Sequence, residues 1–175
     1  TPLPGDYMTD FGLNVPLIEI DPVQLGPAAG GDGGDRADRA DAQLPRALDP
    51  EMVVARCRDA VESFFACRLD RHGLSFHDLP VDTCGMSRFG VLVSQGMRAI
   101  PGGSVTSYSA LARAAGNPRA PRGVGALVGA NPVGLVVPCH RVVGITGKLT
   151  GYGGSLPLKV ALLALEQRMA SAVDA

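Results

Sequence analysis

Apolar residues recur at helical spacing in three stretches of this chain, each with a boundary signal. The first follows Asp49, which is suited to cap a helix, and Pro50, which suits a first helical position. The second runs from Arg88 to Ile100 before Pro101-Gly102-Gly103, and the third from Leu156 to about Met169. The positions expected to face a core are Val53, Val54, Cys57, Ala60, Val61, Phe64 and Phe65 in the first helix, Phe89, Leu92, Val93 and Met97 in the second, and Val160, Leu163, Ala164 and Met169 in the third.

Two shorter helical patterns, Ala110–Ala115 and Pro121–Val128, flank the tight turn Gly116-Asn117-Pro118. Two short helices joined in this way predict a helix-turn-helix. Each glycine inside the helix predicted over Pro121–Val128 costs about 1 kcal/mol of helix stability relative to alanine. Gly123 and Gly125 therefore indicate that another backbone or a ligand approaches this helix closely.

The strand signals are fewer. An apolar run from Val133 to Val137 predicts a buried strand that leads into Pro138-Cys139-His140-Arg141, and Leu17–Ile20 predicts a second, short strand. The segment around 30–39 is polar and rich in glycine, which favours a flexible loop near 27–45.

Charge is distributed unevenly although the net charge is only -1. Residues 1–85 carry 15 acidic and 7 basic residues, a balance of -8, whereas residues 86–175 carry 2 acidic and 9 basic residues, a balance of +7. A basic C-terminal half is the kind of surface that phosphate backbones attract. The alternative is that the two halves merely neutralise each other across an interface.

Several classes of protein are excluded by the composition. No run approaches the ~20 apolar residues of a membrane span, and the N-terminus lacks a signal-peptide pattern, so we expect a cytoplasmic protein. The four cysteines form neither CxxC pairs nor a dense disulfide pattern, and no metal site is expected. The histidines, which are too scattered to suggest metal ligation, are His72, His77 and His140.

The candidate chemistry lies at Cys139, which has the imidazole of His140 beside it. A free cysteine has a pKa near ~8.5, so only a few per cent is thiolate at neutral pH, and a base that lowers this value by ~2 units raises the reactive fraction more than tenfold. The alternative for Cys139 alone is a small buried hydrophobic residue.

A set of motifs extends this pattern from about Phe89 to Gln167, in register and without gaps. Its members are Ser107-Tyr108, Arg122-Gly123-Val124-Gly125, Asn131-Pro132, Pro138-Cys139-His140-Arg141-Val142-Val143, Gly147-Lys148-Leu149-Thr150-Gly151-Tyr152-Gly153-Gly154, Lys159 and Glu166. Together they resemble the 6-O-alkylguanine-DNA alkyltransferases, also called methylated-DNA-protein-cysteine methyltransferases. The resemblance implies direct repair of DNA, in which the alkyl group on the 6-oxygen of guanine passes stoichiometrically to Cys139, with no cofactor.

The resemblance also implies the fold and the domains. We expect an α+β protein in which a divergent N-terminal domain over residues 1–85, with a small sheet and a helix, precedes a mainly helical C-terminal domain over residues 86–175. The second domain would bind DNA and accept the alkyl group, and it would contain the helix-turn-helix and the active-site Pro-Cys-His-Arg strand. Ser94 stands where the family usually has tryptophan, and Gly90 where glutamine is common, which puts core packing in question.

The catalytic roles follow by similarity. Cys139 would be the acceptor, deprotonated through a bound water by His140, and Glu166 would orient that imidazole. Lys159 and Glu166 are expected at the surface of the site, with Lys159 near the leaving oxygen. Tyr108 would press on the DNA phosphate and donate a hydrogen bond to the guanine ring, while Asn131 would brace the turn before the active-site strand.

The DNA contacts also follow by similarity. Arg122 would fill the space that a flipped base leaves, or, as the alternative, contact a phosphate. The other expected DNA-binding residues are Tyr108, Gly123, Ala126 and Arg141, and those expected to wall the base pocket are Val142, Tyr152, Gly153 and Gly154.

The implied partner is double-stranded DNA that contains 6-O-alkylguanine, bound through its minor groove by a monomer that associates with the nucleoid and not with membranes. Two other functions remain open: a catalytically silent protein that binds alkylated guanine and recruits repair factors, and a hydrolase with a Cys-His pair.

Overall fold

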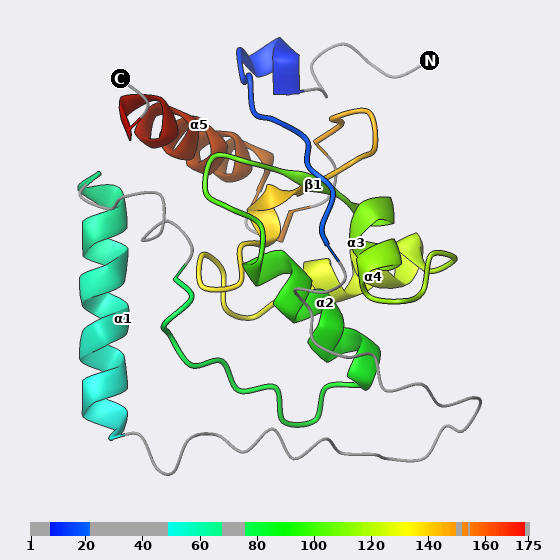
Figure 1. Ribbon diagram of the computed structural model, residues 1–175. Helices are drawn as coiled ribbons and strands as arrows, with labels where there is room; N and C mark the ends of the chain where they lie inside the picture. Colours follow the sequence, from blue (N-terminus) through cyan, green and yellow to red (C-terminus); the bar gives the residue numbers. More distant parts are fainter. Residues whose placement is uncertain (1–7, 22–48, 68–75, 150–151, 154, 174–175) are drawn as a thin grey trace.

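The computed structural model describes residues 8–21, 49–67, 76–149, 152–153 and 155–173. Helices dominate it, and the only sheet in these ranges has two short parallel strands. The elements shown in Figure 1 are the 3-10 helix η1 (Met8–Phe11), α1 (Pro50–Phe65), α2 (Arg88–Arg98), β1 (Thr106–Ser107), α3 (Tyr108–Ala114), α4 (Pro121–Gly129), the 3-10 helix η4 (Cys139–Arg141), β2 (Val142–Val143) and α5 (Leu156–Val173).

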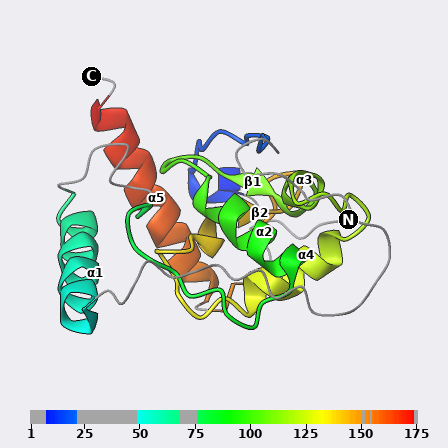
Figure 2. The ribbon, with the colours of Figure 1, turned by 60° about the horizontal axis from the view of Figure 1, so that its bottom comes forward.

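The helix predicted after Asp49 is confirmed as α1, and the Asp49 carboxylate accepts the Glu51 backbone N–H at 3.1 Å. The prediction of which α1 residues face the core is only partly correct. Phe64 is buried beside Phe76 and side chains of α5, whereas Val54 and Phe65 are exposed. The helix lies at the edge of the molecule next to α5 in both ribbon views (Figures 1 and 2). Cys57, Ala60 and Val61 pack against the cluster around Phe64, so only one side of the predicted apolar face is covered.

The helix-turn-helix is confirmed: α3 and α4 pack on each other and on α2, and their shared core contains the fully buried Val93, Leu111 and Val124. Figure 2 shows these three helices gathered on the side of α5 opposite to α1. Ser87 and Ser107 cap α2 and α3 by accepting backbone N–H groups at 3.1 and 3.0 Å.

The small residues of α2 have a packing role. Ser94 is buried, and a Cβ placed on Gly90 would lie 3.5 Å from Leu127 of α4. Gly90 thus lies in the packed contact between α2 and α4, where an added methyl group would make an ordinary van der Waals contact.

The strand predicted over 133–137 is wrong. Val133 is exposed, Leu135 has a φ of 68°, and the segment consists of turns and bends. Pro132 and Pro138 bracket it and cannot donate to a sheet ladder, which disfavours pairing. The expected active-site strand also begins later, because Cys139–Arg141 form η4 and only Val142–Val143 form β2.

The sheet pairs β1 with β2 in parallel, with Thr106 opposite Val142 and Ser107 opposite Val143. The strand predicted at Leu17–Ile20 is reduced to one parallel bridge from Leu17 to Val105. These pairings connect the N-terminal segment, the start of the helix-turn-helix and the segment after Cys139.

The predicted last helix is confirmed as α5, although it extends to Val173. Leu163 and Met169 are buried as predicted, and Leu162 is buried as well. Lys159 and Glu166 were expected at the surface of a site; both are fully buried, on the side of α5 that faces η4. In the described ranges, no helix combines the length and hydropathy that crossing a bilayer would require.

The α+β class is therefore confirmed, with the helix-turn-helix in the C-terminal part. The division at residue 85 stays a prediction, and the loop expected near 27–45 lies outside the described residues.

Gly103 offers a test of the packing around α5. It has a φ of +74°, and an added Cβ would lie 2.7 Å from the Ala170 Cβ. We expect Gly103→Ala to lower the free energy of unfolding by about 2 to 5 kcal/mol, because about 1 to 2 kcal/mol of backbone strain adds to about 1 to 3 kcal/mol of overlap. Urea denaturation measures this loss.

Gly116→Ala is the matched control, because Gly116 has a φ of +78° and open space around an added Cβ. It should lose only about 1 to 2 kcal/mol, from the backbone conformation alone. A Gly103→Ala loss no larger than that of Gly116→Ala would contradict the close packing against Ala170.

Candidate active site around Cys139

Cys139 opens η4 and is 6% exposed. Its N–H donates to Val137 O at 2.8 Å, and Arg141 N–H donates to Pro138 O at 3.0 Å, which forms the tight 3-10 turn. Successive residues of a 3-10 helix are rotated by about 120°, so Cys139, His140 and Arg141 point in three different directions. Within the described chain, no hydrogen bond joins the side chains of Cys139 and His140.

His140 is fully buried, and its Nε2 lies 2.8 Å from Glu166 Oε1. An ionised carboxylate can only accept, so Nε2 carries the proton and donates it to Glu166. Nδ1 then holds a lone pair, and it is a buried atom with no hydrogen-bond partner among the described residues. The imidazole is therefore oriented with its basic nitrogen available for a proton.

Burial is the largest influence on His140 and lowers its pKa below the ordinary 6.5. Glu166 acts in the opposite direction, through its hydrogen bond and its charge, whereas the positive charges of Arg141 and Lys159 lower the pKa further. The imidazole is consequently uncharged at neutral pH, which is the form that can act as a base.

Glu166 is held as a buried carboxylate. Burial by itself would raise its pKa, but the hydrogen bond from His140, the positive charge and hydrogen bonds of Arg141 and, in the acidic range where Glu166 titrates, the charge of protonated His140 outweigh it and lower the pKa to about 2. The backbone N–H of Gly103 also donates to Oε2, at 3.2 Å.

Arg141 was predicted to contact DNA, but its side chain lies in the interior of the protein. It is fully buried, its Nη2 donates to Glu166 Oε1 at 2.7 Å, and its Nη1 donates to Ile100 O at 2.6 Å. In the expected strand, Arg141 and Cys139 would have shared a face, but the 3-10 turn directs Arg141 into the interior.

Lys159 reaches the same region from α5, where its Nζ donates to Val142 O at 2.8 Å. Burial lowers its pKa to about 8, and the opposing charge of Cys139 limits this shift. The ammonium thus stands close enough to the sulfur of Cys139 for the charge of that sulfur to influence its pKa.

Asn131 lies in the turn between α4 and η4. Its Nδ2 donates to Val137 O at 2.8 Å and its Oδ1 accepts the Val133 N–H at 3.2 Å. The side chain thus joins the two sides of the turn that carries Cys139, as the sequence indicated.

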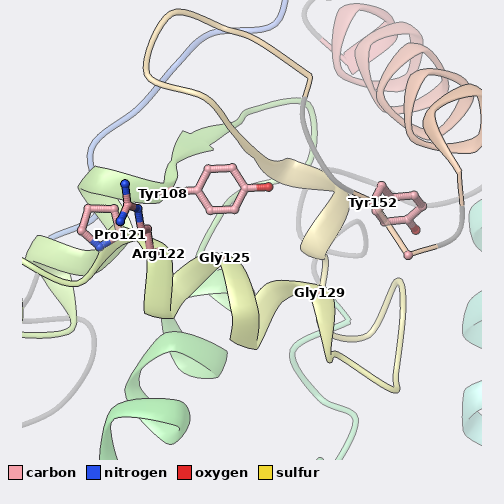
Figure 3. Close-up of a pocket in the computed structure, with 7 residues that line it drawn as sticks. Tyr108, Pro121, Arg122, Gly125, Gly129 and Tyr152 are labelled. Carbon is pink, nitrogen blue, oxygen red and sulfur yellow. The ribbon is translucent and has the colours of Figure 1, made fainter.

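An open pocket of about 600 Å³ lies along α4. This is a size typical of small-molecule sites. Figure 3 shows Arg122 at the N-terminal end of α4, Tyr152 at the far side, and the hydroxyl of Tyr108 directed toward the side of Tyr152. The residues that line it are Tyr108, Pro121, Arg122, Gly125, Gly129, Tyr152 and Gly153.

Tyr152 connects this pocket with the sulfur. Burial raises its pKa above 10, and the negative charge of Cys139 and a hydrogen bond to the Cys139 side chain add to the effect. The phenol therefore lies between the pocket and the nucleophile.

Apart from Arg122, the exposed face of α4 carries only glycine and alanine. Arg122, Gly123 and Ala126 are exposed, whereas Val124 and Val128 face the core. The three predicted DNA-binding positions of this helix thus share an open surface.

The predicted pocket wall is partly different. Tyr152 and Gly153 line the pocket, but Val142 is fully buried in the core, and Gly154 lies outside the described residues. Gly129 and Pro121 were not predicted to line it. Nor did the sequence reveal the partners supplied by Gly103 and Ile100, because backbone groups leave no motif.

The described residues contain no group of three or more histidine, cysteine, aspartate or glutamate side chains placed to hold a metal ion.

The fold and the site define a helix-turn-helix protein with a buried Cys139, His140 and Glu166 site. Comparisons with known proteins show which family has this combination. Residues 88–168 match the family model described as the 6-O-methylguanine DNA methyltransferase, DNA binding domain. A methylated-DNA–protein-cysteine methyltransferase of Mycolicibacterium paratuberculosis is 48% identical over 95 residues, which cover 54% of this chain and 57% of that protein. The inducible enzyme of the same name from Bacillus subtilis is 46% identical over 96 residues, which cover 55% and 53%.

Solved structures agree. A crystal structure of Mycobacterium tuberculosis OGT in complex with DNA has a TM-score of 0.58 and 40% identity, and the match covers 67% of this chain and 68% of that one. The O6-methylguanine methyltransferase of the same organism gives a TM-score of 0.55 at 34% identity over 73% and 78% of the two chains. This chain belongs to the methylated-DNA–protein-cysteine methyltransferase family. The match spans little more than half the length of the two curated relatives.

The pH dependence of stability tests the Glu166 site. Since the pKa of Glu166 falls from an ordinary 4.5 to about 2 on folding, its stabilisation is complete above about pH 5. It is lost as the pH falls from about 4.5 toward 2, by up to about 1.4 kcal/mol per pH unit. Urea denaturation at a series of pH values should show this loss in the wild type and not in Glu166→Gln.

Glu166→Gln also leaves the buried Arg141 without its counter-ion, which should cost about 3 to 5 kcal/mol at pH 7. The control is Glu19→Gln, which removes the 2.8 Å surface pair with Arg113 and should cost under about 1 kcal/mol. Similar losses in the two variants would contradict the buried network.

Proposed function

We propose that this chain repairs DNA by transferring a methyl or other alkyl group from the 6-oxygen of guanine to Cys139, in a single turnover. The observation that carries the proposal is the neutral, oriented His140, whose unpartnered Nδ1 lies in the same tight turn as a nearly buried thiol. Membership of the family and the match to a relative solved with DNA support the same function.

Activation of the thiol requires a proton acceptor that the sulfur does not contact directly. Adjacent residues in a 3-10 turn diverge, so a water between Cys139 Sγ and His140 Nδ1 would carry the proton from sulfur to nitrogen. Glu166, already ionised, would stabilise the imidazolium that results, as the orienting group does in other nucleophile-base-acid sets.

In the transfer step, the thiolate sulfur forms a bond to the alkyl carbon while the bond between that carbon and the 6-oxygen breaks. The electron pair of the broken carbon–oxygen bond passes to the purine, and the purine takes up a proton as it leaves. Lys159, which has a pKa of about 8, and the hydroxyl of Tyr108, which lines the pocket, would stabilise the charge that develops on the purine. Such help typically contributes about 100- to 10,000-fold. The product is a thioether, which cellular thiols do not reverse, so each molecule acts once.

The target base has to leave the duplex to reach a sulfur that is 6% exposed. The pocket along α4 would receive it, with Tyr108 and Tyr152 against the base and Arg122 in the space that it leaves. The exposed Gly123 and Ala126 suit close approach of α4 to the minor groove. Asn131 would hold the Cys139 turn in place during this approach.

A silent protein that only binds the lesion is the second candidate, but it would need neither an oriented base nor a lysine with a lowered pKa beside the sulfur. A cysteine hydrolase would turn over repeatedly on esters or peptides and would not need the open face of α4.

Exchange of the acceptor tests the chemistry. Incubation with duplex DNA that contains 6-O-methylguanine should add one methyl group to the Cys139 peptide, as mass spectrometry would show, with a yield limited to one per molecule. Cys139→Ser should abolish the transfer, because a serine hydroxyl is almost never ionised at neutral pH. The control Cys84→Ser changes an exposed free cysteine and should retain full transfer; methylation elsewhere, or none in the wild type, contradicts the proposal.

Arg122→Ala tests the extrusion of the base. Its loss should slow transfer from duplex DNA about 10- to 100-fold, because a few kcal/mol of unstacking is no longer offset. Reaction with the free base 6-O-benzylguanine, which needs no extrusion, should change little. Single-turnover kinetics on both substrates measure the difference.

Arg113→Ala is the control for the loss of a surface charge, since Arg113 is half exposed and paired with Glu19. If Arg122→Ala slowed both substrates equally, or no more than Arg113→Ala did, the assigned role of Arg122 would be wrong.

A further inference from the structure

Arg141 is a buried charge that the mechanism described above does not use. Its Nε lies 3.1 and 3.0 Å from the two oxygens of Glu166, and its Nη2 lies 2.7 Å from Oε1. Its Nη1 donates to Ile100 O at 2.6 Å, so the guanidinium is fixed at both ends. The same Oε1 also accepts the Nε2 proton of His140 at 2.8 Å. Arg141 and His140 therefore share one carboxylate.

We propose that Arg141 is a positioning residue of the alkyl-transfer reaction: it neutralises Glu166 and so keeps His140 uncharged, with its proton on Nε2 and its Nδ1 lone pair available to the thiol proton. This inference rests on the proposed function, in which His140 is the base. It replaces the expected DNA contact of Arg141 with a role inside the protein.

The charges around His140 carry the argument. Those that face it are Glu166 and Lys159 from α5 and Arg141 from its own turn. With Arg141 in place, the imidazole stands beside an ion pair with no net charge. Without it, a buried carboxylate would lack its main counter-ion, and the nearest group able to supply a positive charge by taking up a proton is His140. Since an unpaired buried charge is strongly unfavourable, that proton uptake is the expected response.

The geometry adds orientation to the charge effect. A guanidinium presents its N–H groups as a rigid fork, and here Nε and Nη2 engage the carboxylate while Nη1 holds the backbone. The carboxylate is fixed in turn, and with it the position of His140 Nε2. A lysine would lose the second N–H of the fork but would keep the positive charge, which is the part that holds His140 neutral.

The first experiment is an NMR titration of the His140 imidazole nitrogens in the full chain, without DNA. In the wild type we expect the neutral form with the proton on Nε2 at pH 7. In Arg141→Met we expect the protonated form at pH 7, and in Arg141→Lys the neutral form. Arg98→Met is the matched control, because its Nη2 is bound by the carbonyls of His77 and Leu79 at 2.8 Å and does not touch Glu166. It should leave the His140 titration unchanged.

The second experiment is the pH profile of the single-turnover methyl transfer. The wild-type rate should not depend on the titration of His140 between pH 6.5 and 8. Arg141→Met should be slowed about tenfold for each unit by which the pKa of His140 exceeds the pH, and the rate should recover as the pH rises. Arg141→Lys should recover most of the rate at pH 7, an outcome that a purely structural role of the guanidinium would not give.

A wild-type His140 that is charged at pH 7, or that carries its proton on Nδ1, overturns the inference even if Arg141→Met does not fold. So does a neutral His140 in folded Arg141→Met. These readouts need no alkylated DNA. An inactive wild type with a neutral, Nε2-protonated His140 would therefore count against the proposed function and not against the role of Arg141.

Discussion

The buried carboxylate of Glu166 connects parts of the chain that lie far apart in the sequence. Gly103 reaches it from the turn after α2, His140 and Arg141 from η4, and the carboxylate itself comes from α5. Burying an ion costs several kcal/mol, which only a complete set of donors offsets. These three elements therefore assemble in the same step that orients the His140 imidazole. Once the protein has folded around Glu166, the His140 proton is held on Nε2.

The 3-10 turn determines what each residue of Cys139-His140-Arg141 does. The Cys139 side chain leaves it toward the pocket side, whereas His140 and Arg141 turn into the interior and meet at Glu166, with Arg141 also reaching Ile100. A strand would have placed the first and third on one face, with a guanidinium beside the nucleophile. Asn131 and Pro138 support the turn from the preceding segment, and β2 fixes its far end by pairing with β1 directly before Tyr108. The backbone geometry thus separates a nucleophile, a base and a counter-ion that are adjacent in sequence.

Local patterns predicted the parts of the structure that depend on local physics. The helical periodicity gave α1, α2 and α5, and the turn at Gly116 gave the helix-turn-helix. The prediction failed where distant partners decide. The apolar run at 133–137 suits a strand or a partly buried turn equally, and only the prolines at its ends argue against pairing. Lys159 and Glu166 were expected at the surface of a site, and Arg141 at a DNA contact, whereas all three are fully buried, which is rare for charged side chains without partners. Their burial depends on partners such as the carbonyls of Val142 and Ile100, which no sequence pattern reveals.

The glycines of α4 show where function and stability diverge. Gly125 and Gly129 have no positive φ, and an added Cβ at either would meet open space, so the fold itself does not require glycine there. Alanine would be expected to stabilise each position by up to about 1 kcal/mol. Helix α4 also begins without a side-chain cap, so it is stabilised mainly by Val124 and Val128 on its inner face. A sequence that forgoes local stability at two positions lining a pocket indicates that the empty space is what the pocket uses. The glycines of this wall are therefore not required by the fold and agree with the base pocket proposed above, whereas Gly103, where a side chain would overlap Ala170, is required by the fold.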